Sequence, residues 1–186
     1  TMKMKNTILF MSSLKFRDIE LDLVKYIKEK KNFDSLFVVN TEQDKDFYLN
    51  KFSKYIDKII AFPNEFDLLD KKNISQTIEE DALKLEKKYN MTINRIFLED
   101  RTIGRGYHST GGINHPETKL SKASHKEILY LAVKRIDFWE KTFKQNNVKL
   151  TLNLAPSVAI IAKALKIKSF NLNLGKFEKR LLWSQN

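Results

Sequence analysis

The chain alternates short apolar runs with longer amphipathic segments along most of its length, and this alternation limits its fold more than any other feature. The runs are about five residues long and rich in β-branched and aromatic residues, which is typical of buried strands. The segments between them have helical periodicity. Strands that alternate with helices indicate βαβ units and an open sheet covered on both faces. The sequence therefore predicts an α/β, Rossmann-like, three-layer fold with a mainly parallel sheet.

The expected elements follow from this periodicity and from capping residues. Ser75 and Ser124 are suited to begin helices as N-caps, and Pro156 with Ser157 opens a later helix. Residues 95–98 fit either a short strand or the end of a helix. We expect strands over 7–12, 35–40, 58–62, 150–154 and 168–172, and helices over 18–31, 44–54, 75–89, 124–145 and 158–165. Residues 1–174 are expected to form one domain, and residues 175–186 a tail or the start of a linker to a second domain.

The composition excludes several classes of protein. The chain has no cysteine, which excludes disulfides, thiolate catalysis and thiolate metal sites. It has no run of about 18 apolar residues, so no transmembrane helix is expected. The apolar run near the N-terminus is too short for a signal peptide. We therefore expect a cytoplasmic protein, with the inner face of the membrane as an alternative location.

The net charge of +11 suggests an anionic partner, and nucleic acid is the first class to consider. Lysine dominates this charge, because only six of the 34 basic residues are arginines. The lysines are spread along the expected helices and do not form a basic tail. An excess of lysine, asparagine and isoleucine is also typical of an AT-rich genome. These observations argue against nucleic acid and favour a small anionic ligand.

The segment from Glu99 to His115 concentrates the residue types that perform chemistry. It holds four of the five glycines, two of the six arginines and two of the three histidines. Arg101 and Arg105 are candidate clamps for a phosphate or carboxylate, because a guanidinium binds such groups with two parallel hydrogen bonds. Glu99, Asp100 and His108 are candidate general bases, which the sequence does not rank. Further candidate substrate-binding residues in the segment are Gly104, Gly106, Tyr107, Gly111, Gly112 and His115.

Each of these features also has a purely structural interpretation. Glu99, Asp100 and Arg101 can form a local ion pair that orders a loop, and Gly111 with Gly112 can be a flexible turn. The glycine spacing matches neither the dinucleotide fingerprint nor the P-loop. The histidines lack the helical spacing of a zinc site, so no metal site is expected.

Two further segments follow expected strands, one at Ser12 and Ser13 and the other from Asn153 to Ser157. Both should lie at the carboxyl edge of the sheet, where the N-termini of helices offer backbone N–H groups to anions. Ser13, Asn153 and Ser157 are therefore candidate ligand contacts. The alternative for Ser13 and Ser157 is simple capping of a helix or turn.

The segment and its surroundings resemble a known family. The resemblance rests on Glu99, Asp100, Arg101, Gly104, Arg105, Gly106 and Tyr107, on Gly111, Gly112, His115 and Pro116, and on the helical Phe138, Trp139 and Glu140. This pattern is similar to the N-terminal region of bacterial capsule and surface-polysaccharide biosynthesis proteins, which are glycosyltransferase-like and have two Rossmann-type domains. Residues 153–157 and 179–186 also resemble the corresponding stretches. The similarity covers most of this chain and about the first third of a typical member.

The resemblance implies an acceptor-side domain of an enzyme that transfers a sugar from a nucleotide donor to a glycan or lipid-linked acceptor. A base among Glu99, Asp100 and His108 would deprotonate the acceptor, and cations such as Arg101 and Arg105 would stabilise the leaving phosphate. The sugar-nucleotide donor is expected only with a C-terminal half, so this chain would carry no cofactor and would be incomplete as an enzyme. Implied partners are a glycan or anionic small molecule, a second domain or a homo-oligomer, and an anionic membrane face.

Two alternatives compete with this hypothesis. One is a non-catalytic Rossmann-like module that binds a nucleotide or a phosphorylated small molecule at Arg101 and Arg105. The other is a basic nucleic-acid-binding domain, which requires lysines clustered on one face. The glycosyltransferase hypothesis instead requires apolar surface at the tail and at the edge of the sheet, where a second domain would pack.

Overall fold

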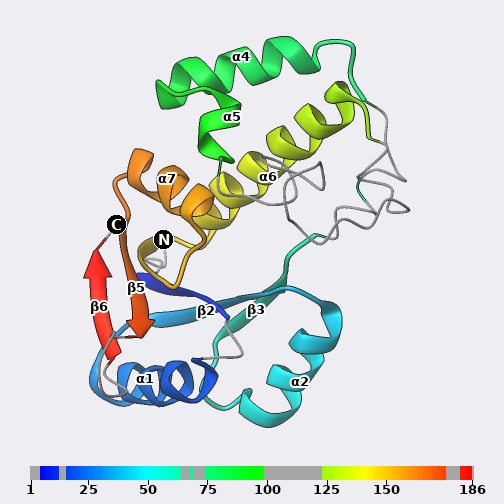
Figure 1. The fold of residues 1–186 in the computed structure, drawn as a ribbon. Coiled ribbons are helices and arrows are strands. Elements are labelled where there is room, and N and C mark those ends of the chain that lie inside the picture. The colour runs from blue at the N-terminus through cyan, green and yellow to red at the C-terminus, as the bar shows by residue number, and fades with distance from the viewer. Residues whose placement is uncertain are drawn as a thin grey trace.

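The computed structural model describes residues 5–12, 16–63, 68, 74–98, 123–174 and 181–185. They form one six-stranded sheet in the order β3-β2-β1-β4-β5-β6, with helices on both faces (Figure 1). The strands are β1 (Thr7–Met11), β2 (Asp34–Val39), β3 (Lys58–Ala61), β4 (Val148–Leu152), β5 (Lys168–Leu174) and β6 (Leu181–Gln185). The helices are α1 (Arg17–Lys30), α2 (Glu42–Phe52), α4 (Ile78–Tyr89), α5 (Ile93–Ile96), α6 (His125–Gln145) and α7 (Pro156–Ala164). Strands β1 to β5 are parallel and β6 is antiparallel to β5, which confirms the Rossmann-like α/β fold.

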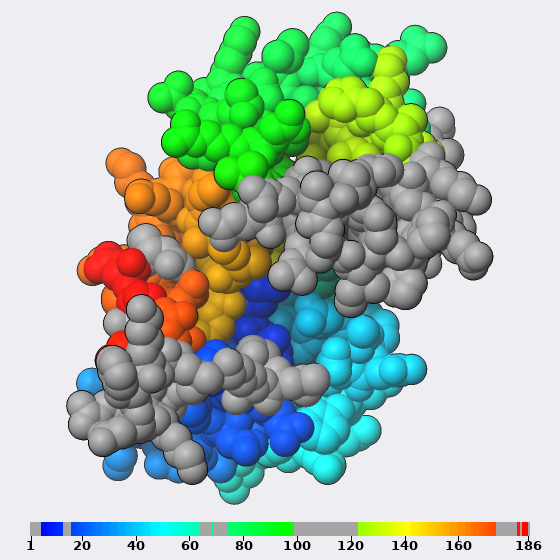
Figure 2. Space-filling view, viewed as in Figure 1, coloured from blue at the N-terminus to red at the C-terminus, as the bar shows by residue number. Residues whose placement is uncertain are grey.

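Both faces of the sheet are buried, and alternate residues of each central strand serve different cores. In β1, Ile8 and Phe10 pack with α1 and α2, whereas Leu9 packs with α6 and α7. This alternation explains why the central strands are continuous apolar runs. Helices α4 and α5 form a further layer, in which α4 packs on α6 (Figure 1). In Figure 2 the blue and cyan surface of α1 and α2 lies at one end of the molecule, and the green surface of α4 and α5 lies at the other end.

The predicted elements are confirmed in kind, and several of their boundaries differ from the prediction by one to three residues. Strand β4 begins and ends two residues earlier than predicted. It ends at Leu152 because the next residue, Asn153, adopts a left-handed φ of 60°. Of the two alternatives for residues 95–98, the helix end is the one observed, because the short helix α5 ends at Ile96 and Phe97 is its C-cap. The N-cap of α4 is Thr77, and Ser75 instead accepts a hydrogen bond from the Thr77 N–H. Strand β6, within the residues predicted to be a tail or linker, was not predicted.

The order of the strands creates a topological switch point between β1 and β4. From β1 the chain builds outward through β2 to β3, and it then returns through α4, α5 and α6 to β4 on the other side of β1. The connections that follow β1 and β4 therefore leave in opposite directions and open a crevice at the carboxyl edge. Ligands of open α/β sheets bind in such a crevice.

Candidate functional site

Most of the predicted site residues lie outside the part of the chain that the structure describes. These are Ser13, Glu99, Asp100, Arg101, Gly104, Arg105, Gly106, Tyr107, His108, Gly111, Gly112 and His115. Their roles stay predictions. Asn153 and Ser157 are among the described residues.

The two segments that were expected at the carboxyl edge do lie there, next to the switch point. Strand β1 pairs with β4 up to Phe10 and Leu152, so the residues that follow them emerge side by side. The Ser12 N–H donates to the Val38 carbonyl (2.9 Å), and the Asn153 N–H donates to the Phe170 carbonyl (2.9 Å). This placement of Ser12 and of residues 153–157 confirms the positional part of the prediction.

A cavity of about 150 Å³ opens at this edge, on the face of the sheet covered by α6 and α7. Its floor is formed where β1, β2 and β3 end, and its walls come from α6, α7 and the end of α5. The lining residues are Met11, Asn40, Phe62, Phe97, Arg135, Trp139, Ala155, Ser157, Val158 and Ile161. Seven of these ten described residues have aliphatic, thioether or aromatic side chains, so the described part of the lining is mainly apolar with a few polar groups. Such a composition is typical of a small-molecule site.

Arg135 supplies the positive charge of the cavity. Its guanidinium lies 5.4 Å from the centre of the Phe62 ring, which in turn stacks on Trp139 at 5.8 Å and an interplanar angle of 27°. This arrangement is a cation–π contact backed by a second aromatic ring. Burial lowers the pKa of Arg135 to about 10, so the guanidinium remains protonated at neutral pH.

Arg135 was not predicted to be a site residue, although the sequence contains a signal for it. The apolar stripe of α6 runs through Ile128, Leu131, Ala132, Ile136 and Trp139 at helical spacing. Arg135 occupies a position within that stripe, where a surface arginine would not be expected. An arginine on the core face of a helix, in a chain that otherwise uses lysine, indicates a specific role for the guanidinium.

Ser157 lies in the first turn of α7 and lines the cavity. Its side chain is buried, with 6% of its surface exposed. The N-cap of the helix is Ala155, so Ser157 is not the capping residue that the structural interpretation required. The structure thus brings Ser157 and Arg135 to the same chamber from two different helices.

Asn153 occupies the edge as predicted, but its side chain is engaged by the protein. Its Nδ2 donates to Oε1 of Glu20 (2.5 Å), and its Oδ1 accepts from the backbone N–H of Leu172 (2.8 Å). Glu20 is buried, with 2% of its surface exposed, although it lies in the first turn of α1. This pair ties α1, the β4–α7 connection and β5 together. Sequence reasoning did not single out Glu20, because its partner is 133 residues away.

On the opposite face of the sheet, Tyr48 of α2 contacts the residue that follows β1. Its hydroxyl lies 2.6 Å from Oγ of Ser12 and forms a hydrogen bond with it. Burial raises the pKa of Tyr48, and the charge of nearby Glu20 acts in the same direction. Tyr48 therefore stays protonated at neutral pH and serves as a neutral support for the end of β1.

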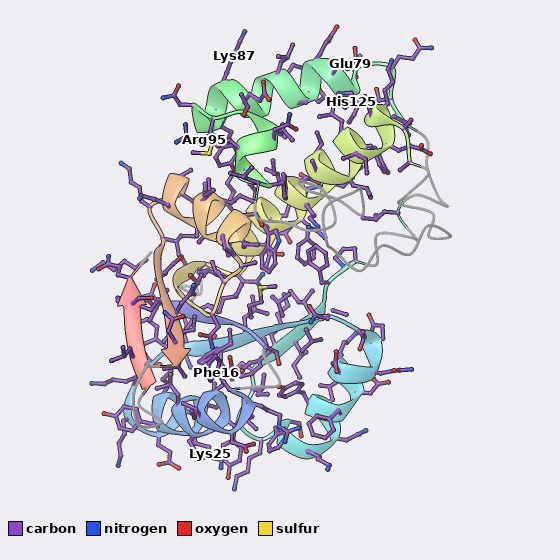
Figure 3. All side chains as sticks on the ribbon, in the orientation of Figure 1. Phe16, Lys25, Glu79, Lys87, Arg95 and His125 are labelled. Carbon is purple, nitrogen blue, oxygen red and sulfur yellow. The ribbon has the colours of Figure 1, made fainter. Side chains whose placement is uncertain are left out.

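Several other polar side chains lie on the outer helices. Figure 3 shows His125 and Glu79 together at the outer end of α6 and α4, with Lys87 and Arg95 also on these outer layers. Within the described ranges, no group of three or more histidine, aspartate or glutamate side chains is arranged to hold a metal ion. None of the helices described combines the length and the apolar character that crossing a membrane requires.

Comparisons with known proteins do not identify the chain. No protein-family model, curated protein or solved structure matches it.

Proposed function

We propose that this chain is the N-terminal, acceptor-side domain of a glycosyltransferase-like protein of surface or capsular polysaccharide biosynthesis, and that the cavity holds one sugar ring of the acceptor. The observation that carries the proposal is the cavity itself. It lies at the topological switch point, it is walled by Phe62, Phe97 and Trp139, and Arg135 is the cation among its described lining residues.

The size and the walls of the cavity favour a sugar ring over a nucleotide. A volume of about 150 Å³ accommodates benzene, so it takes one sugar ring with part of its hydroxyl groups at the open side of the chamber. A nucleoside diphosphate is several times larger and would have to lie mostly outside. The apolar face of a pyranose packs well on aromatic side chains, and its hydroxyl groups can face the open side of the chamber.

The candidate bases belong to a segment that joins two elements of the cavity. Residues 99–122 connect the end of α5 to the start of α6, and Phe97 and Arg135 from these two elements line the chamber. A base for the acceptor hydroxyl would come from Glu99, Asp100 or His108, in the part of the sequence that resembles the polysaccharide-biosynthesis proteins. Edge strand β6 also exposes 56% of Leu182, which is apolar surface that a second domain could cover.

The second candidate function is a non-catalytic module that binds a phosphorylated small molecule, and the charge of Arg135 favours it. A nucleic-acid-binding surface is less well supported, because lysines with acidic neighbours occur on both sides of the molecule. The ion pairs are Lys25–Asp22 on α1, Lys45–Glu42 on α2, Lys84–Asp81 on α4 and Lys141–Asp137 on α6.

The fluorescence of Trp139 provides a direct test. In a Trp183→Phe background Trp139 is the single tryptophan, and a ring that enters the cavity should change its emission. The ligands to titrate are neutral and acidic oligosaccharides, nucleotide sugars, nucleoside diphosphates and a short DNA, each at low and physiological salt. We expect saturable binding of an oligosaccharide.

A matched pair of variants on α7 then tests the location. Ala155→Met adds bulk at the cavity wall and should abolish the response, whereas Ala164→Met, at the exposed end of the same helix, should leave it intact. Binding of DNA alone, lost with salt and insensitive to Ala155→Met, would overturn the proposal. Tight binding of nucleoside diphosphates with no saccharide response would favour the second candidate function.

A further inference from the structure

The start of α7 leaves hydrogen-bond donors exposed to the cavity. Its N-cap is Ala155, which makes no side-chain cap, and Pro156 at the first position has no N–H. The Val158 and Ala159 N–H groups both donate to the Ala155 carbonyl at 2.9 Å. The Ser157 N–H is therefore the first donor of the helix, and no acceptor for it is found among residues 5–12, 16–63, 74–98, 123–174 and 181–185.

The Ser157 side chain gives a second, independent indication of a ligand. The residue is 94% buried, since 6% of its surface is exposed, and it lines the cavity. Its hydroxyl makes no hydrogen bond with any part of the chain that the structure describes. The Ser157 Oγ is not among the fully buried side-chain atoms that lack a partner, so it can be reached from the open cavity. A hydroxyl that loses its contact with water when a ligand binds needs a hydrogen-bond partner. A ligand atom in the cavity would supply that partner.

The electrostatics of this corner favour a negative charge. The first turn of α7 contains no acidic residue, and no acidic residue is among the described residues that line the cavity, so none of these side chains offsets the positive end of the helix dipole. The Arg135 guanidinium lines the same chamber and carries five N–H donors in a fixed plane. A guanidinium and a helix N-terminus that face one chamber form an environment for a phosphate or carboxylate.

From these contacts we propose that Ser157 and Arg135 form an oxyanion subsite, which takes a phosphate or a carboxylate borne on the single ring that the cavity accommodates. The Ser157 N–H and hydroxyl donate to one oxygen or to two neighbouring oxygens, and Arg135 donates to the remaining ones. The subsite rests on the proposed function, since it names the class of saccharide that the acceptor site selects: a sugar that carries one anionic group.

The test uses the full chain and four simple probes: inorganic phosphate, glucose 1-phosphate, glucuronate and glucose. Calorimetry at low salt compares their affinities, and the two anionic sugars distinguish a phosphate ester from a carboxylate. We expect at least one anionic sugar to bind about tenfold or more tightly than glucose, as the loss of one charged hydrogen bond would predict. Equal affinity for glucose and both anionic sugars would overturn the subsite and leave the proposed function standing.

Variants with matched controls test whether the anionic sugar binds at Ser157 and Arg135. Ser157→Ala should weaken the anionic sugar by about tenfold and leave glucose unchanged. The control is Ser169→Ala, which removes another buried hydroxyl, one that bonds to Thr151 at 2.7 Å away from the cavity. Arg135→Met should weaken the same ligand further, whereas Lys134→Met, an equal change of charge at an exposed position of α6, should not. Equal losses in the variants and their controls would overturn the assignment.

An NMR titration of the unmodified chain tests the subsite without any variant, so its result does not depend on whether a variant folds. Titration of the ¹⁵N-labelled protein with inorganic phosphate should shift the Ser157 amide and the Arg135 Nε resonances, with one saturation curve. Shifts confined to lysine-rich surface helices would overturn the subsite. A Ser157 shift with phosphate, together with no binding of any saccharide, would instead support the subsite and overturn the proposed function.

Discussion

The hydrogen bond between Glu20 and Asn153 can be tested by exchanging its donor and acceptor. Asn153 holds three elements together, because it donates to the buried Glu20 carboxylate at 2.5 Å and accepts from the Leu172 N–H at 2.8 Å. Its φ of 60° is a left-handed conformation that asparagine, aspartate and glycine tolerate better than other residues. Asn153→Asp keeps the backbone conformation and the acceptor for Leu172, and it removes only the donor to Glu20.

The expected cost of Asn153→Asp follows from this geometry. A hydrogen bond to a charged group contributes about 1.5–3 kcal/mol, and two carboxylates at this distance cannot both be ionised. We therefore expect the free energy of unfolding to fall by about 3 kcal/mol at neutral pH. The shared proton raises a carboxyl pKa in the folded variant above its unfolded value. Its stabilisation is present below the unfolded pKa and is lost as the pH rises, so the defect should be smaller near pH 5 than near pH 8.

The double variant Glu20→Gln/Asn153→Asp restores the bond with its direction reversed, because the glutamine amide now donates to the aspartate. We expect it to recover most of the lost stability, with a coupling free energy of about 2–3 kcal/mol. Urea unfolding followed by far-UV circular dichroism measures the cycle, and a loss of about 3 kcal/mol corresponds to a fall in Tm of about 6–12 °C for a chain of this size. Additive effects of the two substitutions would refute the inferred hydrogen bond.

Three other predictions concern the helices. Burial acts to raise the pKa of Glu140, but hydrogen bonds from Lys88 (2.5 Å) and Tyr89 hold it below its usual value. Glu140→Gln should therefore lower the free energy of unfolding by about 1–2 kcal/mol at pH 7. The loss should shrink as the pH falls below about 4.3 and through the lowered pKa of folded Glu140, because wild type loses this contribution there; a defect that does not change with pH would contradict the assignment. Asn90 ends α4 with a φ of 49°, so Asn90→Ala should lower the urea midpoint by the equivalent of about 1–2 kcal/mol and Asn90→Gly should not; equal losses would show that the left-handed cap is irrelevant. Ser124→Ala removes one half of the capping box of α6 and should lower the free energy of unfolding by about 1 kcal/mol in the same assay. An unchanged urea midpoint would contradict this prediction.

Some residues of the cavity could be predicted from the sequence and others could not. Ser157 and the edge position of residues 153–157 were predicted, because a strand followed by proline and a helix has only one place in an open α/β sheet. Arg135 was not predicted, although its place in the apolar stripe of α6 could have indicated it. Its proximity to Phe62, 73 positions earlier in the chain, depends on how α6 crosses the sheet.

The sequence by itself determined the kinds of elements and much of their extent. Helical periodicity, capping residues such as Ser124 and continuous apolar runs act over a few neighbouring residues, so they can be detected without knowing the fold. They predicted an α/β architecture with a mainly parallel sheet, and the structure has it.

Only the tertiary structure decided which elements are neighbours. Local periodicity says nothing about strand order, so the placement of β4 beside β1 and the pairing of β6 with β5 were not predictable from it. That order brings Asn153 to Glu20 across 133 positions, and it assembles the cavity from helices and strand ends that are distant in the chain. These contacts arise because burial of both faces of the sheet favours one arrangement of all the layers, a property of the whole chain that no short segment contains.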